Sequence, residues 1–236
     1  MNDSSSSVET LCAAGTDPSK HFAALRQAAL AFNAAYTEQL VEGLSLCPFA
    51  REARRKGETR RAVIWPGPGY RRPLLECLQA ALGDPHISVL QVIFPQLCCS
   101  PDAWIEFCHQ VTASAQAGRG RASFVVAALH PHLPYRTDNP YALVPLFRRA
   151  PDPTIQWIRA SALKKVAEGR EKGSTFVDSA DLSALLSGVE PPPSLYERVA
   201  ELNQQTAQKL GVVALERRFL QLHQEARKKY DQLGAR

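Results

Sequence analysis

The segment "ISVLQVIFP", residues 87–95, decides the fold class. It is almost continuously apolar and rich in β-branched side chains, which is typical of a strand covered on both faces. Two further short runs, "RRAVIW" (60–65) and "ASFVVAAL" (122–129), have a similar character. The chain is therefore expected to contain a sheet of three or more strands.

The segments between these runs carry helix signals. Residues 71–83 have Pro73 near the start and Gly83 at the end, and residues 100–118 begin with Ser100 as a candidate N-cap. Helices of crossover length between buried strands predict an α/β fold, in which helices cover a small sheet. Strand order stays open, and a mixed or ferredoxin-like sheet is an alternative.

The order of helix, strand and polar segments divides the chain into four parts. Steps of three and four predict a helix over residues 22–44, another from Pro153 or Thr154 onward, and two near the C-terminus. The expected organisation, in order along the chain, is a disordered tail at 1–20, an α/β core at 21–170, an insertion or linker at 171–192, and a C-terminal helical segment at 193–236. The last helix is expected either to dock on the domain or to mediate self-association with a partner chain.

Composition narrows the function classes. With 45% hydrophobic residues, the chain has no apolar run near the roughly 18–20 residues that span a bilayer, and its polar start shows no secretory leader. A cytoplasmic protein is therefore expected. The net charge is +5, but 23 acidic residues are interspersed and no nucleic-acid motif is present. These features favour a small anionic molecule over nucleic acid as the partner.

The stretch "GLSLCPFAREARRKG", residues 43–57, presents a candidate nucleophile. A helix beginning at Pro48 would place the sulfur of Cys47 beside free backbone amides and the positive end of the helix dipole, which stabilises a thiolate. Arg51, one turn later, would strengthen this effect and could bind an anionic substrate. A packed structural cysteine and an axial haem ligand are alternatives.

Two histidines follow the third apolar run, in "LHPH" at residues 129–132. His130 and His132 are two apart and would point the same way from the carboxyl end of the strand, where α/β proteins place ligands. Together with Cys47 they would supply the ligand types of a catalytic zinc site. A thiol–imidazole pair without metal, or a turn with a structural role, remain alternatives.

The segment "RRAPDP", residues 148–153, suggests an anion site. Arg148 and Arg149 precede the helix expected at residue 153 or 154, and a helix N-terminus beside guanidinium groups suits carboxylate or phosphate. Asp152 could instead be a plain helix cap.

The segments "GLSLCPFA", "ALHP" and "RRAPDPTIQWIR", taken in this order, resemble the bacterial family called domain of unknown function 1415, over about residues 36–170. The resemblance implies a shared site and adds Arg159 as a further anion-binding residue, but it implies no reaction. The family pattern usually has a histidine where this chain has Gln156, and an acidic residue where it has Ala160. The positions that match are Cys47, Pro48, Phe49, His130, Pro131, Arg149, Pro151, Pro153 and Arg159.

The leading hypothesis is a pocket that gathers Cys47, His130 and Arg149 for thiol-dependent transfer or hydrolysis of a small anionic metabolite. The alternative is a non-enzymatic module that binds a ligand or a partner, with zinc, iron or haem as candidate cofactors. The substitutions at Gln156 and Ala160 favour this alternative.

Overall fold

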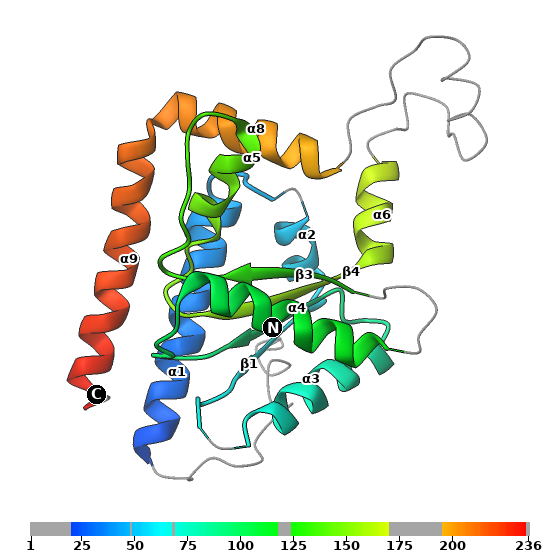
Figure 1. The fold of residues 1–236 in the computed structure, drawn as a ribbon, viewed down its shortest axis with the longest axis vertical. Coiled ribbons are helices and arrows are strands. Elements are labelled where there is room, and N and C mark those ends of the chain that lie inside the picture. Colours follow the sequence, from blue (N-terminus) through cyan, green and yellow to red (C-terminus); the bar gives the residue numbers. More distant parts are fainter. Residues whose placement is uncertain (1–19, 48, 68, 118–123, 170–194, 235–236) are drawn as a thin grey trace, which may run out of the picture.

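The structure is a computed structural model that describes residues 20–47, 49–67, 69–117, 124–169 and 195–234 (Figure 1). The insertion expected at 171–192 and all but the last residue of the expected tail lie outside these ranges. Within the ranges, no helix is long and apolar enough to cross a membrane.

A mixed sheet lies at the centre of the described chain. Its strands, in spatial order, are β1 (Thr59–Val63), β2 (Val89–Ile93), β4 (Thr154–Arg159) and β3 (Phe124–Leu129). β1 and β2 are parallel, and the crossover between them contains α3 (Arg71–Gly83). β4 is antiparallel to both of its neighbours. The predicted α/β class, with a small sheet covered by helices, is therefore confirmed.

Strand β4 corrects one prediction. The helix expected from residue 153 or 154 is wrong, because residues 154–159 form a strand and helix α6 (Ala160–Gly169) starts only afterwards. β4 has a paired strand on each side, and Thr154, Ile155 and Trp157 are fully buried there. Pairing along both edges decides the conformation of such β-branched and aromatic residues, whatever the local spacing suggests.

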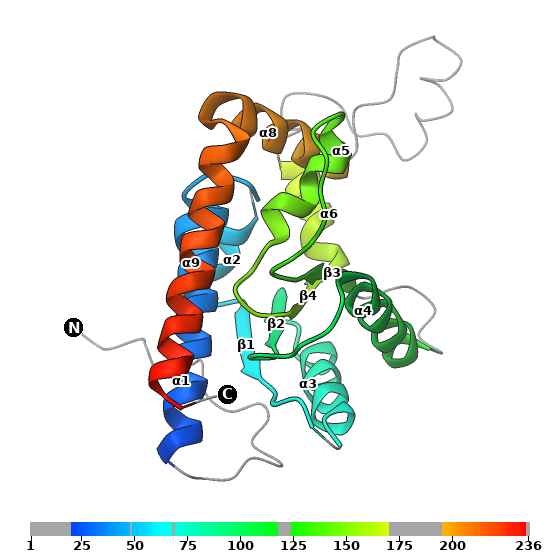
Figure 2. The same cartoon turned by 60° about the vertical axis from the view of Figure 1, so that its left-hand side comes forward.

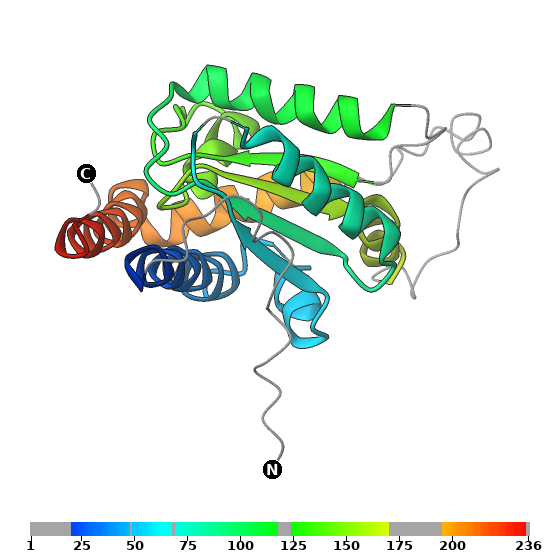
Figure 3. The same ribbon diagram turned by 90° about the horizontal axis from the view of Figure 1, so that it is seen from below.

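Helices α3 and α4 (Pro101–Gln116) cover one face of the sheet, here called the packed face (Figure 3). The side-chain oxygen of Ser100 accepts a hydrogen bond from the amide of Ala103 and caps α4, as expected. The rings of Trp104 and Phe94 meet edge-on with centroids 5.3 Å apart. Further buried members of this face include Leu74, Leu78, Leu90, Val92, Cys108, Val111, Phe124, Ile155 and Trp157.

The opposite face is covered by α1 (Lys20–Ala35), its continuation η2 (Tyr36–Glu42), α2 (Ala50–Arg55) and α9 (Val212–Gln232). Helices α9 and α1 lie side by side (Figure 2). The apolar side chains of α9 are buried against the same domain, so this face docks internally and is not free for a partner chain. These side chains are Leu215, Phe219, Leu222, Ala226 and Tyr230.

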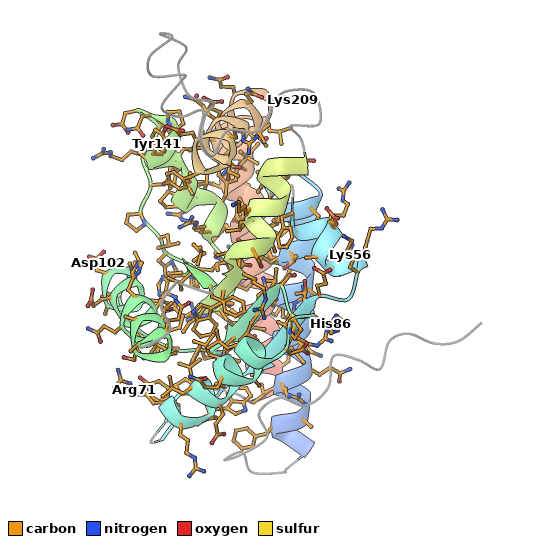
Figure 4. All side chains as sticks on the ribbon, turned by 90° about the vertical axis from the view of Figure 1, so that its right-hand side faces the viewer. Lys56, Arg71, His86, Asp102, Tyr141 and Lys209 are labelled. Atoms are coloured by element: carbon orange, nitrogen blue, oxygen red, sulfur yellow. The ribbon has the colours of Figure 1, made fainter. Side chains whose placement is uncertain are left out.

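One end of the molecule is built from α5 (Pro140–Leu143), η3 (Val144–Arg148) and α8 (Leu195–Leu210), which contact one another. Tyr141 and Lys209 mark this end in Figure 4, with Arg71 near the other. The segment between β3 and β4 therefore contains two short helices, α5 and η3. Together with α6 they place helices beyond the edge strand β3 (Figure 1).

Candidate functional site

A row of aligned side chains crosses the sheet on the face opposite the packed face, one from each strand. Arg61, Gln91 and Gln156 are direct cross-strand neighbours, and Ala127 completes the row. Arg61 Nε donates to Gln91 Oε1 at 3.0 Å and to Asn33 Oδ1 of α1 at 2.8 Å. Gln91 Nε2 in turn donates to Gln156 Oε1 at 2.7 Å. The row is a hydrogen-bonded chain that starts at a half-buried cation.

A cavity of about 550 Å³ lies over this row, bordered by η2, α6 and α8, and its face of the sheet is here called the cavity face. The volume falls within the range of roughly 300–1,000 Å³ that is typical of small-molecule sites. Gln91, Gln156 and Ala127 belong to its floor. Most of the wall is apolar and includes Leu46, Phe49, Val89, Leu129, Val144 and Ile158.

Two polar side chains of the wall lack partners within the described ranges. Arg148 is half-buried, and its guanidinium has neither an ion pair nor a hydrogen bond there. Asn203 on α8 is only 2% exposed, and its Oδ1 accepts no hydrogen bond from any described residue. A buried acceptor without a donor is unfavourable by about 1–3 kcal/mol, so such groups mark places where a ligand or water completes the structure.

Cys47 lies in the wall of the cavity, between η2 and α2. Burial raises the pKa of its thiol above the ordinary value, and this outweighs the amides of Phe49 and Ala50, which act in the opposite direction. The nearby Glu42 carboxylate raises the pKa further. The expected thiolate is therefore not favoured, because the sulfur packs among apolar groups instead of facing water at the helix start.

His130 and His132 lie outside the cavity that contains Cys47. His130 is 2% exposed, and its Nδ1 accepts a hydrogen bond from the backbone amide of His132 at 3.1 Å. Burial, together with the neighbouring His132, holds the pKa of His130 below its ordinary value. His132 is exposed, with its ring 5.8 Å from that of His130. Neither histidine lines the cavity that contains Cys47, so the structure does not bring the expected thiol and imidazole into one pocket.

Arg149, which was expected to bind the substrate, is held outside the cavity by contacts near α9. Its Nε donates to the carbonyl of Leu133 at 2.9 Å, and its Nη1 lies 3.3 Å from Glu216 Oε1. The guanidinium also lies over the ring of Tyr135, 4.9 Å from its centroid. The neighbouring Arg148, and not Arg149, faces the cavity.

Arg51 and Arg159 are likewise engaged in the fold. Arg159 donates to the carbonyls of Ala81, Ile87 and Asp84 at 2.6–2.8 Å, which ties β4 to the end of α3. Arg51 donates to the carbonyl of Glu42 at 2.7 Å. Both arginines therefore have structural partners and do not line the cavity.

The carboxylate of Glu42 is buried, and Arg54 binds both of its oxygens at 2.8 Å. This bidentate pair, together with Arg51, holds the pKa of Glu42 below its ordinary value. The pair ties η2 to α2 and so fixes the stretch that carries Cys47.

The metal and anion sites predicted from sequence are not assembled. Among the described residues, no group of three or more histidine, cysteine, aspartate or glutamate side chains is placed to hold a metal ion. The helix start that was expected to support an anion site after Asp152 is absent, because a strand begins at Thr154. Asp152 is buried instead and accepts hydrogen bonds from Tyr230 Oη at 2.6 Å and from the amide of Gln96 at 3.3 Å.

Gln91 and Asn203 were not among the residues predicted for the site. A lone glutamine inside the apolar run "VLQVI" was a usable signal, because a buried polar side chain needs a partner. Asn203 carried no such signal in the polar sequence of α8.

Comparisons with known proteins add a family. A family model described as "Protein of unknown function (DUF1415)" matches residues 30–178. The "Bifunctional NAD(P)H-hydrate repair enzyme Nnr" of Pyrobaculum aerophilum is 33% identical over 112 residues, which is 47% of this chain but only 22% of that relative's length. No solved structure matches the chain. Because the family model covers more than half of the sequence, the resemblance noted in its motifs is confirmed, and the chain belongs to the DUF1415 family.

Proposed function

We propose that this chain binds a small organic acid with an apolar body in the cavity between the sheet and α8. The observation that carries the proposal is the combination of apolar walls with the guanidinium of Arg148, which lacks a partner within the described ranges. An aliphatic body would be buried against the walls, and an acid group would neutralise the cation.

Arginine suits this role for a physical reason. A guanidinium is permanently charged and presents a planar set of donors that matches a carboxylate or phosphate. Lys164 adds a second positive charge to the lining. The anionic ligand expected from sequence is thus retained, with Arg148 in the place first given to Arg149.

The raised pKa of Cys47 supports binding over thiol catalysis. A nucleophilic cysteine requires a lowered pKa or an adjacent base, and neither His130 nor His132 lines the same cavity. Thiol-dependent transfer or hydrolysis therefore becomes the second candidate, which rests on the position of the sulfur in the wall.

The relative from Pyrobaculum aerophilum is named for NAD(P)H-hydrate repair, and the matched stretch is 22% of that protein. For this chain, nicotinamide nucleotides are therefore an additional ligand to titrate. A cytoplasmic location also stays a prediction, which imaging of the tagged full chain would test.

The binding proposal is tested by calorimetric titration of delipidated protein with octanoate and with 1-octanol. Octanoate should bind about tenfold more tightly, because hydrogen bonds to charged groups are the stronger ones. The substitution Arg148→Gln should reduce octanoate affinity to that of the alcohol and leave the alcohol unaffected.

The control is Arg217→Gln, which removes an exposed cation of α9 and should change neither affinity. Equal binding of acid and alcohol to the unsubstituted protein would contradict the role of Arg148. Failure of both to bind would contradict the proposal itself.

A further inference from the structure

The hydrogen-bonded row on the sheet has a fixed direction. An arginine side chain has only donors, so Gln91 must turn its oxygen toward Arg61. The amide nitrogen of Gln91 then faces Gln156, which must accept through its own oxygen. This assignment follows from the chemistry of the guanidinium and leaves no choice of amide orientation along the row.

The direction determines what the row presents to the cavity. The oxygen of Gln156 is used by Gln91, and its Nε2 has no partner within the described ranges. Because Gln156 belongs to the cavity floor, its remaining N–H groups are available there to an acceptor. The adjacent Ala127 is small and leaves space beside them.

Helix α8 presents a hydrogen-bond acceptor to the same cavity. Asn203 Oδ1 is an acceptor without a donor within the described part of the chain, and the side chain belongs to the cavity wall. The sheet therefore offers a hydrogen-bond donor and α8 an acceptor, in a cavity that also contains the cation of Arg148.

We infer that the ligand is a hydroxy acid with an aliphatic body. Its acid oxygens accept from Gln156 and Arg148, and its hydroxyl group donates to Asn203. Arg61 and Gln91 are positioning residues, which act on the ligand by orienting Gln156. This inference rests on the proposed function and adds which group donates and which group accepts in each hydrogen bond to the ligand.

The row can be tested without any ligand, by hydrogen exchange of the side-chain amides in ¹⁵N NMR spectra. The Gln91 amide protons should be protected and those of Gln156 should exchange quickly. In Gln91→Glu, the new carboxylate accepts from Arg61 and forces Gln156 to rotate and donate to it. The Gln156 amide protons should then become protected. Unchanged exchange would contradict the direction assigned to the hydrogen-bonded row.

The same variant tests the ligand contact from a distance. Rotation of Gln156 would turn its oxygen toward the acid group, so Gln91→Glu and Gln156→Glu should each weaken octanoate binding about tenfold. The control Gln205→Glu, on the exposed side of α8, adds the same charge away from the cavity and should have no effect.

The ligand class is tested with octanoates that carry a hydroxyl group at carbon 2, 3 or 8. At least one should bind about tenfold more tightly than octanoate, because it satisfies a buried acceptor. Asn203→Leu should abolish this gain and retain octanoate binding. If octanoate binds and no hydroxyl improves it, the ligand class is overturned and the proposed function stands. If no acid binds, both are overturned.

Discussion

The two faces of the sheet are built from alternate residues of the same strands and serve different ends. In β4, Ile155 and Trp157 enter the packed face, whereas Gln156 and Ile158 border the cavity. The packed face is filled by interlocking aromatic rings, and the indole of Trp157 donates to Thr112 Oγ1 at 2.8 Å. The cavity face combines a polar row with unfilled volume.

The two faces therefore contribute differently to stability and to ligand binding. Close packing against α3 and α4 supplies the stability that a domain needs. The cavity face forgoes part of this stabilisation and keeps space, a directed set of donors and a cation. One strand can therefore contribute both to the core and to a ligand site, because its side chains alternate between the faces.

The largest expected difference between the faces comes from a matched pair of truncations in β4. Ile155→Ala should lower the free energy of unfolding by about 2–5 kcal/mol, because it opens a void in a close-packed core. Ile158→Ala enlarges an existing cavity and should cost about 1 kcal/mol or less. Urea unfolding of both variants measures this, and equal losses would show that the faces are equally packed.

Asp152 is buried just before β4, and its carboxylate accepts a hydrogen bond from Tyr230 of α9. Burial raises the pKa of Asp152 to about 6 from 3.8. Since the folded pKa lies above the unfolded one, the stabilising contribution is complete below pH 3.8 and is lost as the pH rises through 6. The loss should amount to roughly 3 kcal/mol across this window.

Asp152→Asn should remove this loss, which is measured as the difference in unfolding free energy between the two proteins from pH 4 to pH 7. The difference is used because His130 and His223, whose pKa values are lowered by burial, have the opposite effect in an overlapping window. The exposed Asp138→Asn provides the control. A pH-independent difference would contradict the raised pKa.

A smaller effect is expected from adding volume to each face. Ala127→Leu extends into the cavity and should change stability by less than about 0.5 kcal/mol while it blocks octanoate binding. Ala81→Leu adds the same atoms to the fully buried side of α3 and should cost about 1–3 kcal/mol. Thermal unfolding with calorimetric titration separates the two, and intact binding to Ala127→Leu would place the ligand elsewhere.

The contrast between the faces also explains what the sequence could reveal. The strands β1, β2 and β3 were predictable, because apolar runs bounded by turn residues show burial directly. Strand β4 was not, because "TIQWIR" after a proline-rich stretch has no local feature that separates a strand from a helix. Its conformation depends on β2 and β3, which flank it only in the folded chain.

The site was less predictable than the fold. The position of Cys47 before a helix could be seen in sequence, but its raised pKa depends on apolar groups contributed by other segments. Similarly, nothing local distinguishes Arg148 from Arg149. Only the fold shows that Arg149 pairs with Glu216 on α9, whereas Arg148 lines the cavity.

The smallest expected effect concerns the reactivity of three cysteines. Cys98 is exposed, Cys47 borders the cavity and Cys108 is fully buried on the packed face. Burial raises the pKa of both Cys47 and Cys108. At pH 7.5, iodoacetamide should therefore modify Cys98 first and Cys47 more slowly, and Cys108 should react only on unfolding.

Mass spectrometry of digested peptides over time gives the three rates, and octanoate should slow only Cys47. A Cys47 that reacts faster than Cys98 would instead indicate a thiolate and revive the catalytic alternative. If octanoate protects Cys98 and not Cys47, the ligand does not occupy the cavity. The order of the rates thus tests whether the volume beside Cys47 is open to small molecules, as the comparison of the two faces requires.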